Sequence, residues 1–385
     1  MKTLRYPALI AALIVAGFAT SLPAQASKPY FSQNPNQQQA SRRATVELLF
    51  VLDTTGSMGG MLEGAKTKIW GIVNDVLQQQ GNGGATVRVG LVAYRDRGDA
   101  CVTLITPLSD NLDAVYTQLM SFKAQGGGDG PEDVRSAMAE AVRVGGWSAP
   151  GPRTSQIMFL VGDAPPHDDY RNLPSTTASS RNAAGRGIIV NAIQCGSDPA
   201  TTHAWRGIAQ SGGGEYFAIA QDGGVDVMVT PYDDQLARLG EQIGGTYLAY
   251  GVTEKRVARQ SAQVAMESSV VAAAPVAAKA ERSLNKALND KAYDDSDLLQ
   301  KAESGRVALP HIAEAELPDS LRKLAPQQRQ AALDKAVAQR KALRGQIVAL
   351  SKQREQYLAE QRRKGGGGKG GFDTAVSNAL TRQIK

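Results

Sequence analysis

Short apolar runs alternate with helical patterns between residues 45 and 251, and this alternation limits the possible folds more than any other feature. The apolar runs predict strands at 46–52, 86–93, 102–106, 156–161, 187–194 and 215–219. The helical patterns cover 60–79, 111–123, 131–144, 176–184 and 201–210. Such alternation predicts an α/β fold with a doubly wound, mostly parallel sheet and helices on both faces.

The residues before this region predict export. Residues 1–26 combine Lys2 and Arg5 with a short apolar stretch and an Ala-x-Ala site, which is typical of a secretory signal peptide cleaved after Ala26. An uncleaved interfacial helix is the alternative. The polar residues 27–44 predict a disordered leader. Since no later apolar run is long enough to span a bilayer, we expect no transmembrane segment and a periplasmic or secreted protein.

The residues after 251 predict an α-helical extension. We interpret 252–316 as an Ala/Ser-rich linker with weak helices, 317–364 as a strong helix, 365–371 as a glycine-rich linker and 372–385 as a short amphipathic basic tail. A three-four apolar spacing predicts a short coiled-coil seam, formed by Leu333, Ala336, Leu343, Ile347, Leu350 and Tyr357 and interrupted by Arg340 and Arg354. The seam would allow self-association. The tail either packs on its own domain or binds a partner, and anionic lipid or cell-wall polymer is one candidate.

Charge and cysteine content exclude some functions. The formal charge is +6, and it falls to about +4 without the predicted signal peptide, which is too weak for nucleic-acid binding. The two cysteines are Cys101 and Cys195. We expect an antiparallel edge strand near 102 on one side of the first strand and the strand near 190 on the other. The two thiols would then lie too far apart for a disulfide.

The first predicted strand ends in an unusual stretch, ELLFVLDTTGSMGGML (47–62), which points to a cation site. Ligands of open α/β sheets bind beyond the carboxyl ends of the strands, and Asp53 lies at such an end. Asp53, Thr55 and Ser57 alternate along the turn, so their oxygens can point to one side. Hard divalent cations prefer oxygen ligands of this kind.

Two further acidic turns follow other predicted elements. Asp129 lies in the loop GGGDGPED (126–133), and Asp163 lies in LVGDAPPHDD (160–169), directly after a strand. Three acidic turns on one edge of a sheet would repel one another unless a cation neutralised them.

These motifs and their order resemble the von Willebrand factor A-like domain (vWA), a Rossmann-like fold with a metal-ion-dependent adhesion site. The resemblance covers about 45–251, and the glycine-rich loop is most similar to hemicentin-like A domains, here in an exported protein of bacterial type. It implies that Thr55 and Ser57 bind metal directly, while Asp53 and Asp163 act partly through water. Asp129 stands where the family has threonine. It would add a third carboxylate to the shell or, alternatively, cap the following helix.

The resemblance also implies a function. One divalent cation, Mg²⁺ first and Mn²⁺ or Ca²⁺ as alternatives, would form a docking surface for another extracytoplasmic protein, whose carboxylate completes the metal shell. The rim of this surface would include Met58, Glu132, His167 and Asp168. The protein would be an adhesion or scaffolding module and not an enzyme.

Two other functions remain open on the sequence. DTTGS also resembles the loop of aspartyl-phosphate phosphatases, in which Asp53 would be the nucleophile. Against this, Thr55 replaces the expected second aspartate, and no lysine occurs between Lys123 and Asp163. Alternatively, the protein is a structural assembly protein that acts through its helical extension.

Overall fold

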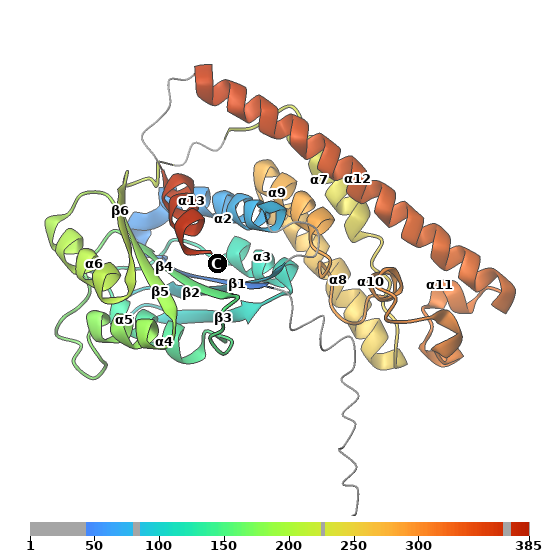
Figure 1. The fold of residues 1–385 in the computed structure, drawn as a ribbon, viewed down its shortest axis with the longest axis horizontal. Coiled ribbons are helices and arrows are strands. Elements are labelled where there is room, and N and C mark those ends of the chain that lie inside the picture. Colours follow the sequence, from blue (N-terminus) through green and yellow to red (C-terminus); the bar gives the residue numbers. More distant parts are fainter. Residues whose placement is uncertain (1–43, 80–84, 225–227, 365–370, 385) are drawn as a thin grey trace, which may run out of the picture. The chain divides into compact units, whose positions relative to one another are not determined.

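The computed structural model describes residues 44–79, 85–224, 228–364 and 371–384. The predicted signal peptide, all but the last residue of the leader and the glycine-rich linker up to residue 370 lie outside the described residues. The described part up to residue 219 is an α/β domain with helices on both faces of a sheet (Figure 1).

One six-stranded sheet forms the centre of the α/β domain. Its order is β3-β2-β1-β4-β5-β6, and among these strands only β3 is antiparallel to its neighbour. The strands are β1 Ala44–Asp53, β2 Ala85–Tyr94, β3 Thr103–Ser109, β4 Thr154–Gly162, β5 Ile188–Cys195 and β6 Gly213–Ile219. The predicted fold class, a mostly parallel doubly wound sheet with an antiparallel edge strand, is confirmed.

Two helical layers cover the sheet because β1 presents apolar side chains on both faces. Leu48 and Phe50 join the core with α2, α3 and α13, whereas Leu49 and Val51 join the core with α4, α5 and α6. The helices of these layers are α2 Gly59–Gln79, α3 Leu112–Ser121, α4 Val134–Val144, α5 Thr176–Gly185, α6 Pro199–Ser211 and α13 Phe372–Gln383. The central strand is therefore buried from Val46 to Asp53, and its end at Asp53 is fixed in place.

The two cysteines are free, as the predicted topology requires. Cys101 is exposed just before β3, and Cys195 is buried at the end of β5. The sheet order puts β3 and β5 on opposite sides of β1.

The helical extension lies in the chain between β6 and α13. Its helices are α7 Asp233–Gly244, α8 Thr253–Ala273, α9 Val276–Leu288, α10 Leu298–Glu303, α11 Asp319–Arg322 and α12 Pro326–Lys364. The segment expected to be a linker with weak helices holds two well-formed ones, α8 and α9. Helix α9 packs against both α2 of the sheet layer and α12 of the extension, so the extension is built onto the α/β domain.

The apolar seam of α12 packs within the same chain. Leu343 and Ile347 join Leu236 and Ile243 of α7 in one buried cluster. The two arginines that interrupt the seam are buried as well: Arg354 bonds to Asp233 and Glu281, each at 2.6 Å. The arginines that interrupt the seam therefore help to hold α12 in place, and this face of α12 packs against other helices of the same chain.

Arg340 forms the most buried ion pair of the extension. Its side chain and that of Asp297 are both 0% exposed. The guanidinium also donates to the hydroxyl of Thr246 at 2.8 Å and to the carbonyl oxygen of Thr246 at 2.7 Å. All three nitrogens of the guanidinium therefore donate to an acceptor, which offsets the cost of burying the charges.

Replacing Arg340 with methionine is expected to destabilise the protein by about 3–5 kcal/mol, because it leaves the Asp297 carboxylate buried without a partner. Urea unfolding measures the change. Lys364→Ala is the matched control on the same helix, since the Lys364–Glu360 pair is exposed and its loss should leave the midpoint nearly unchanged. Equal midpoints for the Arg340 variant and the control would contradict this role.

Helix α13 completes the layer that also contains α2 and α3. Phe372 and Val376 are fully buried, and the ring of Phe372 lies 6.4 Å from that of Phe50 in β1. The helix contacts α2 and strands β4, β5 and β6. Of the two roles left open for the tail, packing on its own domain is the one that the structure adopts.

Candidate metal centre at the carboxyl edge of the sheet

The turn after β1 gathers the first predicted ligands. Both the backbone N–H and the hydroxyl of Thr55 donate to Asp53 Oδ1, at 2.9 and 2.6 Å. The hydroxyl of Ser57 lies 3.3 Å from that of Thr55. Asp53 is fully buried, and its other carboxylate oxygen, Oδ2, has no hydrogen-bond partner among the described residues. The oxygens of Asp53, Thr55 and Ser57 therefore lie close together in this turn. One buried oxygen, Asp53 Oδ2, stays without a partner among the described residues.

Glycines let two loops approach this turn closely. Gly162 ends β4 so near Asp53 that an added Cβ would lie 3.0 Å from Asp53 Oδ2. Gly126 has a φ of 79°, and an added Cβ would lie 2.2 Å from Asp99 Oδ1, so only glycine fits there. Its carbonyl oxygen accepts the N–H of Gly56 at 3.1 Å. The glycines directly before Asp163 and in the loop before Asp129 thus allow this close approach.

Glu132 is the carboxylate that the sequence analysis placed on the rim, but the structure buries it. It is 3% exposed, and its Oε2 atom has no hydrogen-bond partner among the described residues. Its backbone N–H donates to Pro165, and its carbonyl oxygen accepts the N–H of His167. These bonds tie the 126–133 loop to the loop after β4. In the sequence, the one feature that could have indicated the inward position of Glu132 is its place directly before Asp133, which caps α4.

Asp163 follows β4 at the same edge. Its Oδ1 atom is buried without a hydrogen-bond partner in the described part of the chain. Its Oδ2 atom accepts the side-chain amide of Gln221 at 2.5 Å. Gln221, which lies just after β6, is a contact that the sequence analysis missed, because nothing in its local pattern singles it out.

The pKa values indicate how closely these acids are grouped. Burial raises the pKa of Asp53 to about 7; hydrogen bonds from Thr55 oppose this, and the Asp163 carboxylate adds to it. Burial also raises the pKa of Glu132 to about 8, with further increases from Asp53 first and then from Asp96 and other acids. In the described part of the chain, neither Asp53 nor Glu132 has a positively charged neighbour that would favour its ionised form.

A pocket of about 360 Å³ opens beside these groups. Ser57, Asp129, Glu132, Asp163 and Asp198 line it. None of its lining residues is lysine or arginine, so the phosphoryl-transfer alternative has no side chain here to neutralise a phosphate.

Asp129, Met58 and Asp168 lie in three different environments. Asp129 does not cap the next helix, because Asp133 does so; its carboxylate lies 3.5 Å from His167 Nε2. Met58 was predicted on the rim but is fully buried in the core, where it offers no surface to a partner. Asp168 is exposed and accepts from Arg135 at 3.1 Å.

The geometry defines an α/β domain with acidic loops at the carboxyl edge of an open sheet, where such domains bind ligands. Residues 47–221 match the family model of the von Willebrand factor A domain. This match supports a von Willebrand factor A domain in this part of the chain, which contains every predicted site residue.

Three similar proteins each match less than half of the chain. The von Willebrand factor A domain-containing protein 7 of Rattus norvegicus is 36% identical over 123 residues, which are 32% of this chain and 12% of the relative. A protein of Acanthamoeba polyphaga mimivirus named as an ariadne-like RING finger protein is 28% identical over 127 residues, again 32% of this chain and 12% of the relative. The solved SpRpn10 VWA domain is 12% identical, with a TM-score of 0.34, and the match covers 46% of this chain and 89% of that one.

Proposed function

We propose that the protein is an exported binding module that docks another protein through a divalent cation at the carboxyl edge of its von Willebrand factor A domain. Asp53, Thr55, Ser57 and Asp163 would hold the cation, with Glu132 as a third carboxylate. Mg²⁺ is the first candidate, and Mn²⁺ or Ca²⁺ are the alternatives. Asp129 would line the docking pocket.

One observation carries this proposal: three buried carboxylate oxygens at this edge have no hydrogen-bond partner among the residues that the structure describes. They are Asp53 Oδ2, Glu132 Oε2 and Asp163 Oδ1. An unpaired buried carboxylate oxygen is costly, and a divalent cation is the ligand that removes this cost. The hydroxyls of Thr55 and Ser57 add the neutral oxygens of such a shell. The residues present therefore fit a hard cation.

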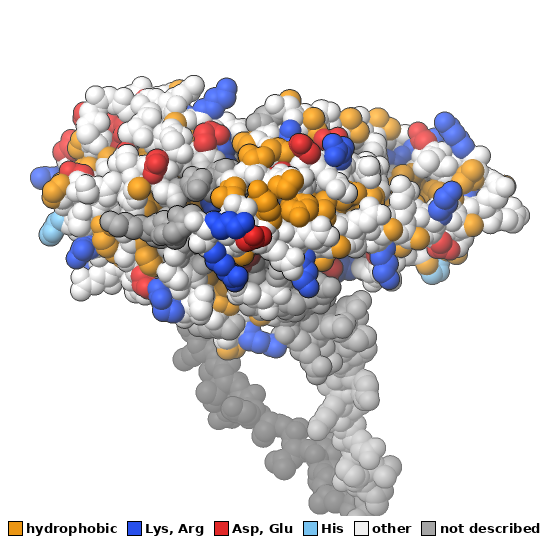
Figure 2. Space-filling view, turned by 90° about the horizontal axis from the view of Figure 1, so that it is seen from above, with side chains coloured by type: hydrophobic (Ala, Val, Ile, Leu, Met, Phe, Trp, Pro, Cys, Tyr) orange, Lys and Arg blue, Asp and Glu red, His pale blue; other side chains and the backbone are white. Residues whose placement is uncertain are grey.

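The surface favours a protein partner. Von Willebrand factor A domains are generally interaction modules, and the pocket beside the three acids is open to solvent on the side where a partner would dock. On the face shown in Figure 2, lysine and arginine side chains are scattered among acidic ones. They form no continuous basic patch on this face of the kind that binds nucleic acid. Within the described ranges, no helix has both the length and the apolar character needed to cross a membrane.

Isothermal titration of Mg²⁺, Mn²⁺ and Ca²⁺ tests the metal site. We expect one saturable Mg²⁺ site in the wild type that is lost in Asp53→Ala and Asp163→Ala, and at least tenfold weaker in Glu132→Gln. Asp168→Ala is the control, since this exposed acid lies in the same loop as Asp163 but bonds to Arg135 instead. Wild-type affinity in the Asp163 variant would refute the site.

Partner docking is tested separately by capture from the extracytoplasmic fraction in Mg²⁺ and in EDTA. We expect a protein that is retained in Mg²⁺, released by EDTA and not retained by Asp163→Ala. Retention that survives EDTA and the Asp163 substitution, but is lost when residues 317–364 are removed, would assign the interaction to the helical extension instead.

A further inference from the structure

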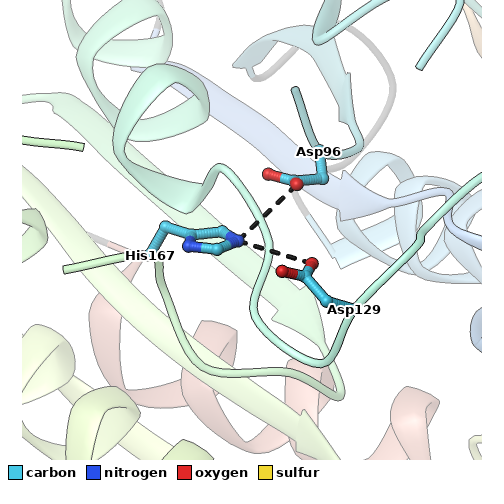
Figure 3. A group of neighbouring side chains, drawn as sticks. All are labelled: Asp96, Asp129 and His167. Atoms are coloured by element: carbon cyan, nitrogen blue, oxygen red, sulfur yellow. Dashed lines mark ion pairs between the residues drawn. The ribbon is translucent and has the colours of Figure 1, made fainter. Parts of the chain in front are cut away.

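A second group of metal-ligating side chains lies beside the first site. His167 Nε2 faces two carboxylates, Asp96 Oδ2 at 3.6 Å and Asp129 Oδ1 at 3.5 Å, and Figure 3 shows the ring pointing between them. Within the described residues, this is the group of three whose candidate ligand atoms all lie within 4.8 Å of one another. The three side chains come from three loops: the one after β2, the glycine-rich loop and the loop after β4.

The neighbours of His167 hold its ring in one orientation. Nδ1 lies 2.8 Å from Asp169 Oδ1, and the ring stacks on Tyr170 with the centroids 4.1 Å apart. The Tyr170 hydroxyl donates to the Asp96 carboxylate at 3.0 Å, and Arg97 covers the other side of the Tyr170 ring. A carboxylate only accepts, so Nδ1 carries the proton and Nε2 is the atom left to bind something else.

Nε2 is a buried atom without a hydrogen-bond partner in the described structure. Asp96 is also buried, at 7% exposed. Burial lowers the pKa of His167, but the hydrogen bond to Asp169 and the Asp96 and Asp129 carboxylates raise it overall, so these groups favour a positive charge beside Nε2. The distances of 3.5 and 3.6 Å are too long for hydrogen bonds from a protonated ring. A cation between the three atoms would satisfy all of them.

The spacing fits a metal ion. Ligand atoms bound at about 2.0–2.2 Å in a tetrahedral shell lie about 3.4 Å apart, close to the two distances from Nε2. Asp129 is 60% exposed, so its side chain is free to close on an ion. Asp169 and Tyr170 would act as outer partners that orient the histidine and one carboxylate.

We propose that Asp96, Asp129 and His167 form a second cation site that takes a divalent transition-metal ion, with Zn²⁺ or Mn²⁺ as the class. An imidazole nitrogen with two carboxylate oxygens suits these ions, whereas Mg²⁺ and Ca²⁺ prefer oxygen ligands alone. The site shares no ligand with the one at Asp53, and it stands whether or not the proposed function is correct. The Asp53 and Asp96 carboxylates both add to the raised pKa of Glu132, which burial raises most.

Pulsed electron paramagnetic resonance of Mn²⁺ added to the untagged full chain tests the site, because it detects nitrogen bound to the ion. We expect a nitrogen-coupled Mn²⁺ in the wild type and in Asp53→Ala, and none in His167→Ala. His203→Ala is the control, since His203 is an exposed histidine of the same domain. Zn²⁺ titration should give at least tenfold weaker binding in Asp129→Asn, a change at an exposed side chain that leaves the fold intact.

Two results would overturn the proposal. One is a Mn²⁺ spectrum of the wild type without nitrogen coupling, which would mean that a proton alone occupies the space between the three side chains. The other is unchanged Zn²⁺ affinity in both Asp129→Asn and His167→Ala. Loss of binding in Asp53→Ala with retention in His167→Ala would support the first metal site and reject the second.

Discussion

A chain that ends at residue 370 is expected to lose the cooperative unfolding of its α/β domain, because α13 supplies part of the core. Phe372, Val376 and Ala379 are each 0% exposed. Removing them uncovers Phe50 and the apolar face of α2. Phe372→Ala alone should cost about 3–5 kcal/mol, since it deletes a buried aromatic ring.

Urea denaturation followed by tryptophan fluorescence measures this effect, as Trp70 lies in the same core cluster. Arg382→Ala is the matched control: its ion pair with Glu215 is exposed, so its loss should move the midpoint little. A truncated chain with the wild-type midpoint would show that α13 is dispensable and that the tail is free for another role.

Asp53→Asn is expected to stabilise the metal-free protein at pH 8. The folded-state pKa of Asp53 is raised from 3.8 to about 7, so the protonated form is the one that folding favours. The corresponding stability is fully present below the unfolded pKa and is lost as the pH rises through about 7. The shift is equivalent to roughly 4 kcal/mol at pH 8, and asparagine removes the charge that causes the loss.

The test compares unfolding free energies in EDTA at pH 5 and pH 8. The wild type should lose stability over this range more than Asp53→Asn does, and Mg²⁺ should restore it at pH 8 in the wild type only. Asp168→Asn serves as the control, because this exposed acid should follow the wild type. Equal pH dependence in the wild type and Asp53→Asn would contradict the raised pKa.

Local patterns predicted most of the fold. Helix α2 was expected at 60–79 and runs over Gly59–Gln79, and the strand expected at 156–161 lies within Thr154–Gly162. These elements are long and strongly patterned, so periodicity alone identifies them. The same patterns gave the sheet edge at which Asp53 and Asp163 meet, because parallel strands bring their carboxyl ends together.

Contacts between loops could not be predicted in this way. Asp129 and Glu132 lie three residues apart in one loop, and only the backbone bonds to Pro165 and His167 decide which of them turns inward. Met58 lies in a polar turn, but a 3-10 helix directs it into the core. The arginines of α12 read as interruptions because their partners, such as Asp297, are distant in sequence. In each case the deciding contact is tertiary.

The position of α13 after the whole helical extension has a consequence for biosynthesis. The sheet is complete once β6 has been made, but the helix that covers one of its faces is synthesised only after α7 to α12. At about 5–20 residues per second, the ribosome needs roughly 10–30 s to reach it. During that interval the nascent chain exposes the site for Phe372 and Val376. The core of the domain can therefore be completed only after its last helix has been translated, and until then its apolar surface is open to a chaperone.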